Sequence, residues 1–513
     1  MKKYLLFCLL FVSKQIIAQV PDDAVRYSNF PQNGTARNLA IGGAMGSLGG
    51  DINATFVNPA GLGFYKTGEF VFTPGFILNN NKASYRDTDT KSKKNAMSFG
   101  TSGLVIGFPN RRNKNSSAVS LAITQTANFN NQLNYTGLNN YSSFSEQFAE
   151  EFAKSGKSIN EVLNSNSIFP YTSAPALYAY LIDTVKVNGV YQVKGAPEYI
   201  LDAGQAIRQD MTKVTKGGIT EFALGLASNH ADKWFFGGTI GIPYLSYSSN
   251  MTFKESDTSS NGSNHFKSFD YNDQFKTTGW GVNVKLGMIY RPKEYIRLGL
   301  ALHTPTFSSL SDTRTTTLNT QLENPVGSFS ASSLTFTNNV AGESKYFQTG
   351  VWKLIGSASY VFREIENVKR QRAFITADLE YVTHGASRFN SNNDQPTQDE
   401  KNYYKALNNV IKAEYKGAIN ARIGGELKFN TIMGRLGFAY YGNPYKDAAI
   451  KANKMLLSGG LGYRNKGVFF DLTYVHNISK DADFAYRLED RANTYASLKQ
   501  TRGNIVATLG FKL

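Results

Sequence analysis

The residues of this sequence that could do chemistry include a glycine-rich stretch near the N-terminus. Residues 34–64 read G-T-A-R-N-L-A-I-G-G-A-M-G-S-L-G-G-D-I-N-A-T-F-V-N-P-A-G-L-G-F. Glycine clusters can cradle phosphates with backbone N–H groups, but no G-K-S/T follows Gly42 to Gly50. No strand precedes the stretch with the spacing that a dinucleotide-binding fold requires. The sequence therefore argues against a nucleotide site.

Two other sets of residues could act as ligands or catalysts. Asp378 and Glu380 are two residues apart, but motif-free carboxylate pairs are common in structural ion networks, so we expect them to pair with arginines. The sequence has no G-x-S-x-G elbow. The histidines are far apart and form no H-E-x-x-H motif: His230, His265, His303, His384 and His476. We expect no enzyme activity, no metal and no cofactor.

The N-terminus predicts export. Lys2 and Lys3 precede an apolar core, and Ile16-Ile17-Ala18 is a plausible cleavage site, so residues 1–18 read as a signal peptide. The core of about nine residues is too short to span a bilayer as a helix, and no later run approaches the roughly 20 apolar residues needed. The one cysteine, Cys8, lies within this core. We therefore expect neither disulfides nor thiol chemistry in the mature chain.

Composition and charge favour a membrane protein. Among 513 residues there are 46 glycines and 13% aromatic residues, but only 18% charged residues. This balance is typical of many strands with glycine turns and aromatic belts. The net charge is +16, but the basic residues are scattered and the chain is exported. We therefore expect anionic outer-membrane lipid and lipopolysaccharide as partners, and no nucleic acid.

From residue 69 onward the hydrophobic pattern has a period of two. Ile419, Ile423 and Leu427, for example, alternate with Arg422 and Glu426. The alternation predicts fourteen strands, at residues 69–79, 97–109, 117–130, 219–228, 233–250, 275–291, 295–305, 347–363, 372–385, 416–429, 433–442, 455–464, 467–478 and 501–513. Alternation alone fits either a soluble sandwich or a membrane barrel.

Two further features favour the barrel. The non-apolar face mixes small residues with charges of both signs, as a crowded wet lumen would: Arg297, Asp378, Glu380, Arg422, Glu426, Arg435 and Asp471. Short connections also alternate with long ones such as 131–218, 306–346 and 386–415, which is the outer-membrane pattern. We predict an all-β protein, a 14-stranded antiparallel transmembrane β-barrel over residues 69–513 in the cell outer membrane.

The glycine-rich stretch is then the one non-strand element placed to enter the pore. We expect residues 19–68 to form a hatch that enters from the periplasm and plugs the lumen. Glycines would let its backbone pack closely and bend, namely Gly42, Gly43, Gly46, Gly49, Gly50 and Gly61. Pro59 fixes one φ angle and removes a donor, and Asn58 can satisfy its own turn.

The longest predicted loop, residues 131–218, carries its own pattern on the extracellular side. Phe144, Phe148 and Phe152 recur every four residues, which predicts an amphipathic helix. Residues 174–182, with Leu177 and Tyr180, form a second apolar patch. The two patches either pack on each other over the barrel mouth or form an external groove that captures hydrophobic ligands.

The glycine-rich stretch resembles the N-terminal hatch of the FadL-type outer-membrane transporters of hydrophobic compounds, in their Bacteroidetes-like form. Residues 281–306 and the segments A-D-L-E-Y-V (377–382) and F-A-Y-Y-G-N-P-Y (438–445) are also similar to that group. The resemblance implies a 14-stranded barrel that captures long-chain fatty acids, aromatic hydrocarbons or similar molecules and releases them by hatch rearrangement. We expect the protein to be a monomer. The family's Asn-Pro-Ala box corresponds to Asn58, Pro59 and Ala60.

The sequence also allows other functions. PorV-type shuttle proteins of the type nine secretion system resemble the same family and bind protein cargo, whereas the helix-bearing loop and residues 281–306 favour a transporter. A haem receptor is disfavoured because no extracellular His/Tyr pair stands out, although His265 lies in a predicted outer loop. A static plug without gating is a further alternative, because a gate needs two conformations of similar energy.

Overall fold

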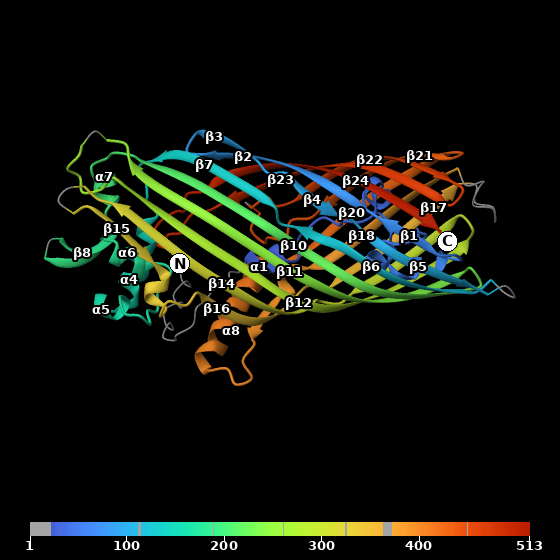
Figure 1. Cartoon of the computed structure of the whole chain (residues 1–513), viewed down its shortest axis with the longest axis horizontal. Coiled ribbons are helices and arrows are strands. Elements are labelled where there is room, and N and C mark those ends of the chain that lie inside the picture. The colour runs from blue at the N-terminus through green and yellow to red at the C-terminus, as the bar shows by residue number, and fades with distance from the viewer. Residues whose placement is uncertain are drawn as a thin grey trace, which may run out of the picture.

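The structure is a computed structural model that describes residues 22–110, 114–187, 189–259, 261–323, 326–362, 372–448 and 450–513. The predicted signal peptide, residues 1–18, and residues 19–21 of the predicted hatch lie outside these ranges. The described chain forms a long barrel, with helices gathered at one end and one helix projecting from its side (Figure 1).

Nearly all strands belong to one antiparallel sheet that closes on itself, since β1 and β2 pair with β24. The strands are β1 (Glu69–Phe72), β2 (Pro74–Tyr85), β3 (Thr88–Lys93), β4 (Ala96–Phe99), β5 (Ser102–Pro109), β6 (Ser116–Asn128), β7 (Asn131–Asn139), β10 (Ile207–His230), β11 (Trp234–Asp257), β12 (Ser268–Lys293), β13 (Ile296–His303), β14 (Phe307–Gln321), β15 (Ser328–Ser332), β16 (Gly342–Thr349), β17 (Lys353–Phe362), β18 (Ala373–Thr383), β19 (Arg388–Ser391), β20 (Gly417–Phe429), β21 (Ile432–Tyr441), β22 (Lys454–Asn465), β23 (Val468–Asp483) and β24 (Ala496–Lys512).

Fourteen barrel strands result, because four of them consist of two consecutive elements and two consist of three. The double ones are β1 with β2, β6 with β7, β13 with β14, and β18 with β19, and the triple ones are β3 with β4 and β5, and β15 with β16 and β17. The predicted 14-stranded antiparallel β-barrel is thus confirmed. Short turns also alternate with long connections: only residues 294–295 separate β12 from β13, whereas residues 392–416 separate β19 from β20.

Several strands are longer than the sequence pattern predicts. β10 begins at Ile207 rather than at 219, and β14 occupies residues that the pattern assigns to the loop 306–346. The predicted bounds 131–218 of the longest loop are therefore wrong at both ends, since β7 and the start of β10 fall within them. The missed extensions carry polar side chains such as Lys216 on their outer face, so no apolar alternation marks them, although their backbone ladder continues.

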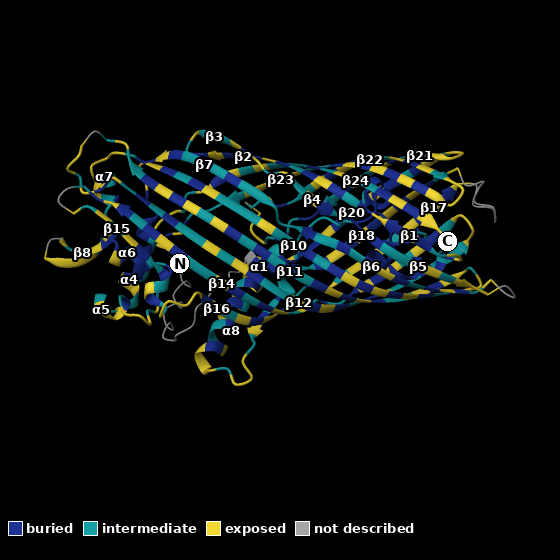
Figure 2. Ribbon diagram, viewed as in Figure 1, coloured by how far each residue is buried: buried dark blue, intermediate teal, exposed yellow. Residues whose placement is uncertain are grey.

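The outer face of the barrel carries an apolar band. Exposed and buried residues alternate along the strands (Figure 2), and the most exposed side chains include Leu436 at 75%, Leu461 at 66% and Leu121 at 65%. The inward positions instead hold small, polar and charged residues. Apolar residues outside and polar residues inside are the reverse of the arrangement in a soluble protein, and they fit an outer-membrane barrel whose apolar band faces lipid.

Residues 22–64, here called the N-terminal segment, lie inside the barrel (Figure 1). The segment contains α1 (Asp22–Arg26), α2 (Ala36–Ala40), α3 (Ala54–Val57) and the 3-10 helix η1 (Pro59–Phe64). Its buried apolar residues join inward-facing strand residues in separate small clusters rather than in one large core. The barrel interior is therefore filled by the chain's own N-terminal residues.

The long connections build the outer part of the molecule. They contain α4 (Ser145–Ser155), α5 (Ile159–Val162), α6 (Ser173–Tyr178), the hairpin β8 (Ile182–Val187) and β9 (Val190–Gly195), α7 (Glu198–Asp202), η2 (Ser333–Phe336), η4 (His384–Ala386) and α8 (Gln398–Glu414). The largest apolar cluster lies there, between α4, α6 and the extended ends of β10, β11, β12 and β14. α8 packs its buried face, including Leu407 and Ile411, against a second cluster that also contains Tyr27 of the N-terminal segment.

Candidate functional site

The N-terminal segment is held in shape by local polar contacts and glycines. The Thr35 side chain accepts the N–H of Asn38 at 3.2 Å and caps α2, while its hydroxyl donates to Asp51 at 2.9 Å. Gly42, Gly43, Gly49 and Gly50 all have positive φ angles between 67° and 80°. Such angles favour glycine because it lacks a Cβ.

Close approach of neighbouring atoms, rather than a positive φ angle, explains why glycine occupies positions 46 and 61. A Cβ on Gly46 would lie 2.7 Å from the Cβ of Ser357 on β17, and one on Gly61 would lie 2.9 Å from the Cβ of Ala54. Strand glycines face the segment in turn: a Cβ on Gly437 would lie 2.1 Å from the nitrogen of Gly42. Bare backbone on both sides lets the segment touch the wall directly.

Asn58 links the N-terminal segment to the barrel wall. Its Nδ2 donates to the carbonyl of Gly46 at 2.5 Å and to that of Met288 on β12 at 3.3 Å, while its Oδ1 accepts the N–H of Ala60 at 3.1 Å. Pro59 and Ala60 pack against Gly237 of β11, where a Cβ would lie 2.3 Å from the carbonyl carbon of Pro59. The Asn-Pro-Ala box therefore lies at a contact between two strands and the segment.

One carboxylate of the wall binds the segment directly. Asp378 accepts the backbone N–H groups of Met45 at 3.0 Å and Gly46 at 3.1 Å, and the Ser357 hydroxyl at 2.5 Å. Arg422 lies 3.9 Å from Asp378 and 3.2 Å from Glu380. The pair Asp378 and Glu380 is thus part of an ion network, as expected from the sequence.

A second ion network includes a residue that the sequence analysis missed. Arg435 contacts Glu426 at 2.6 Å and Asp471 at 2.5 Å. Arg37 of α2 reaches Glu426 at 3.6 Å and donates to the carbonyl of Gly50 at 3.0 Å. Arg37 has no alternating pattern around it, so the lumen-charge criterion could not find it.

Arg297 stands apart from the other predicted lumen charges. Its guanidinium donates to the carbonyl of Leu48 and lies 4.7 Å from the ring centre of Phe64. The structure thus places all seven predicted charges in the barrel interior, with six of them in two networks and Arg297 directly against the segment.

A cavity of about 170 Å³ remains between the N-terminal segment and the strands. Its apolar lining includes Phe30, Phe56, Val57, Leu245, Val351 and Ile355. Its charged lining includes Lys285, Lys353, Glu221, Glu380 and Arg422. Lys285 pairs with Glu221, and Arg422 with Glu380. Lys353 has no ion pair within the described ranges and lies 5.4 Å from the ring centre of Phe30.

The residues proposed for ligand capture are mostly buried. α4 forms where the four-residue spacing predicts a helix, and Phe144, Phe148 and Phe152 are at most 5% exposed. Phe144 stacks on Phe253 of β11 at 4.8 Å, and Leu177 lies in the same cluster. Of the five residues only Tyr180 is exposed, at 50%, beside Phe329. In this structure the two apolar patches pack together over the barrel mouth.

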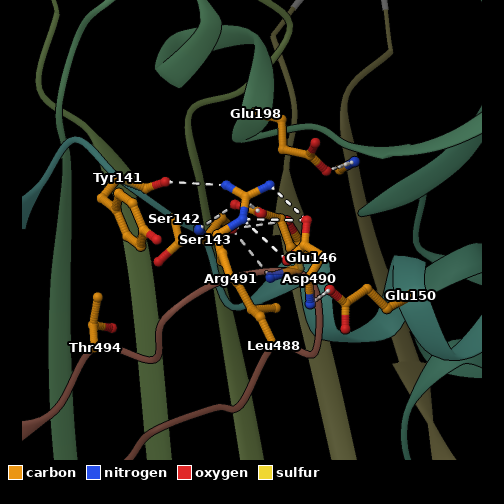
Figure 3. A network of polar contacts seen from close by, with 12 residues as sticks. Tyr141, Ser142, Ser143, Glu146, Glu150, Glu198, Leu488, Asp490, Arg491 and Thr494 are labelled. Atoms are coloured by element: carbon orange, nitrogen blue, oxygen red, sulfur yellow. Dashed lines mark hydrogen bonds and ion pairs between the residues drawn. The ribbon is translucent and has the colours of Figure 1, made fainter. Parts of the chain in front are cut away.

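Polar contacts fasten α4 to the connection between β23 and β24 (Figure 3). Arg491 pairs with Glu146 at 3.1 Å and donates to the carbonyl of Tyr141, while Glu150 accepts the N–H of Glu489 at 3.0 Å. Burial raises the pKa of Glu146, and burial together with the charge of Glu146 raises the pKa of Glu198 to about 7. The closed mouth thus contains buried carboxyl groups.

No helix in the described ranges is long and apolar enough to span a membrane. Among the described residues, no group of three His, Cys, Asp or Glu side chains is placed to hold a metal ion.

Comparisons with known proteins identify the fold. No family model and no curated protein matches the sequence. Among solved structures, a Pseudomonas aeruginosa FadL homologue matches with a TM-score of 0.52 and 13% identity, over 94% of this chain and 99% of that one. The P. putida toluene transporter TodX matches with a TM-score of 0.50 and 13% identity, over the same shares. The chain therefore has the fold of FadL-type transporters.

Proposed function

We propose that this protein passively transports hydrophobic small molecules across the outer membrane, as a monomer, with residues 19–68 as a hatch. The two matching structures are by name a toluene transporter and a FadL homologue, and this supports a hydrophobic ligand. The observation that carries the proposal is the cavity beside the N-terminal segment. It lies inside the barrel, and residues of the segment, Phe30, Phe56 and Val57 among them, form part of its lining.

The lining of the cavity supports an amphipathic ligand with an acidic head, such as a long-chain fatty acid. Lys353 offers a cation that forms no ion pair within the described ranges, next to the apolar walls of Phe30 and Val351, whereas Glu221 and Glu380 of the same lining are paired with Lys285 and Arg422. A dry cavity of about 150 Å³ holds one benzene ring, so 170 Å³ accommodates a head group and a few carbons. A longer chain therefore has to extend into space that the segment fills here.

The residues of the hatch have distinct roles in this proposal. Gly42, Gly43, Gly46, Gly49 and Gly50 allow the backbone to rearrange, Asn58, Pro59 and Ala60 hold the segment against β11 and β12, and Gly61 lets η1 pack closely on Ala54 of α3. The lumen charges, Arg297 and Asp378 among them, hold the closed form. Capture by Phe144, Phe148, Phe152, Leu177 and Tyr180 requires the α4 connection to open first, because four of these side chains are buried.

Transport is tested with the purified protein and a deletion strain. Organic extraction of the protein and mass spectrometry should identify a bound hydrophobic acid, and the deletion strain should take up long-chain fatty acids more slowly. If the protein carries no lipid, uptake is unchanged and protein secretion is lost, the transport proposal fails and a PorV-like shuttle role replaces it.

The acidic-head hypothesis has a separate test. Lys353→Gln should slow uptake of fatty acids and leave uptake of toluene unchanged, because only the charge is removed. Lys345→Gln, on exposed residue 345 of β16, is the matched control. Equal uptake of fatty acids by Lys353→Gln and the control would contradict a role for Lys353, whereas transport itself would still stand.

A further inference from the structure

A second cavity, outside the lumen, has the composition of an anion site. It measures about 460 Å³ and lies between α8 and β19, where α8 projects from the side of the barrel (Figure 1). Its lining residues include Arg388, Lys401, Lys405, Asn390 and Asn409. Pockets of about 300–1,000 Å³ hold small organic ligands, so this one is larger than a free phosphate needs.

The short strand β19 turns two of these residues outward. Phe389 is buried beside Tyr346, whereas Asn390 lies directly across from Phe347, whose side chain is 45% exposed. Since successive strand residues alternate sides, Arg388 and Asn390 share the outer face of the barrel with Phe347. The cavity therefore opens on the face that meets the membrane.

The helix supplies the other wall. Lys401, Lys405 and Asn409 recur every four residues and so lie along one face of α8. Asn408 fixes that wall to β19, because its amide donates to the carbonyl of Phe389 and accepts the N–H of Phe389, both at 2.8 Å. The two walls of the cleft are thus held together by the protein itself.

The charge balance of the cleft is positive. Arg388 is anchored by its Nη1, which donates to the carbonyls of Ser387 at 2.7 Å and Gly385 at 3.0 Å. Across the described ranges, none of the three cations Arg388, Lys401 and Lys405 has an ion pair with a carboxylate. Glu400 lies nearby but is buried and receives the hydroxyl of Ser391. The cleft therefore has three cations, and the one carboxylate named beside them, Glu400, already accepts a hydrogen bond from Ser391.

Aromatic residues mark the height of the cleft relative to the membrane. Trp352, which directly precedes β17, and Tyr381, near the end of β18, are 44% and 48% exposed and lie at the strand ends closest to β19. Tryptophan and tyrosine concentrate at the level of lipid head groups. The cleft thus lies just beyond the apolar band, where the phosphates of outer-leaflet lipids are found.

We propose that the cleft between α8 and β19 binds the phosphate-bearing head group of an outer-leaflet lipid. Arg388, Lys401 and Lys405 contact the phosphate, Asn390 and Asn409 bind neighbouring sugar hydroxyls, and the acyl chains lie against Phe347. The inference depends on the barrel spanning a membrane and is independent of what the lumen transports.

The test uses native mass spectrometry of the full-length protein in detergent. The probes are bisphosphorylated lipid A, the same lipid without phosphates, and inorganic phosphate alone. The variant is Lys401→Gln/Lys405→Gln. The matched control is Lys412→Gln/Lys416→Gln, which removes the same charge from exposed positions in the last turn of α8 and just beyond its end. The shift of the folded band on unboiled gels verifies that each variant forms a barrel.

The wild-type protein and the control should bind bisphosphorylated lipid A equally well. The Lys401→Gln/Lys405→Gln variant should bind it roughly tenfold or more weakly, as expected for the loss of two cations near a charged membrane surface. Equal binding by this variant and the control, or equal binding of the phosphate-free lipid, would overturn the proposal. Displacement of the lipid by inorganic phosphate at equal concentration would also overturn it, in favour of a free-anion site.

Discussion

Replacing Gly437 by alanine should force the N-terminal segment away from the wall. The added Cβ would lie 2.1 Å from the nitrogen of Gly42 and 2.3 Å from the carbonyl carbon of Ile41. β21 cannot retreat, because residue 437 is paired with Gly424 on β20 and with Ser458 on β22. The segment must therefore move and weaken contacts such as the 3.2 Å hydrogen bond from the Gly42 N–H to Ser458.

The size of the effect follows from the cost of overpacking. Forcing an extra methyl group into a close contact costs about 1–3 kcal/mol. At tenfold for each 1.4 kcal/mol, the closed form should be disfavoured by about 5- to 150-fold relative to an open form. The barrel itself should remain folded, since its ladder on both sides of residue 437 is unchanged.

Conductance across planar lipid bilayers measures this shift. The wild-type protein should be nearly silent, and Gly437→Ala should show frequent openings. Gly434→Ala is the matched control on the same strand, because a Cβ there meets nothing within 4 Å. If Gly437→Ala is as silent as Gly434→Ala in equally folded samples, the contact between the segment and β21 does not hold the lumen closed.

Three further outcomes are expected. Asp378→Asn removes a charged acceptor of two backbone N–H groups, and each of these hydrogen bonds is worth about 1.5–3 kcal/mol. Hydrogen exchange of the Met45 and Gly46 amides should therefore accelerate relative to the exposed control Asp394→Asn. Unchanged exchange would refute the contact. Between about pH 5 and 7 the packed Glu198 keeps a proton that the opened loop releases, so the stability of the packed loop should fall as pH rises. Proteolysis within residues 140–206 should therefore be faster at pH 8 than at pH 6. An equal pH dependence in Glu198→Gln would contradict this role of Glu198. Arg491→Ala breaks the half-exposed ion pair with Glu146, which is worth at most about 1 kcal/mol, so amide hydrogen exchange in residues 484–495 should rise up to about fivefold. If the rise is no larger than in the control Arg208→Ala, the ion pair does not fasten the mouth.

The barrel could be predicted because its signal is local. Residues such as Ile419, Ile423 and Leu427 lie on the outer face of β20, and because this face must be apolar, hydrophobic residues recur there with a period of two. Beyond the apolar band the outer face meets water, so the extensions of β10, β11 and β12 leave no such pattern. Phe253 and Tyr271, which pack around Phe144, lie in those extensions, and the burial of α4 could not be foreseen without them.

The contacts of the N-terminal segment were less predictable for a different reason. The glycines of the segment and Asn58 stand out by composition, and the lumen charges stand out by their place in the strand alternation. Their contact partners on the barrel wall do not stand out in the sequence, because a segment packed in a lumen has no fixed register with the strands. The opposition of Gly437 and Gly42, and the contact of Arg37 with Glu426, depend on a three-dimensional fit that no sequence period records.

A reversible cross-link between the segment and the wall tests the gating hatch most directly. The hydroxyls of Ser47 and Ser359 lie 2.6 Å apart and both residues are buried, so Ser47→Cys/Ser359→Cys places two thiols within bonding reach. Cys8, in the predicted signal peptide, is the one native cysteine. We expect the oxidised double variant to lose uptake of the hydrophobic ligand and to regain it on reduction, while each single variant transports normally under both conditions. Uptake at the wild-type rate by the fully cross-linked protein would contradict a hatch that moves.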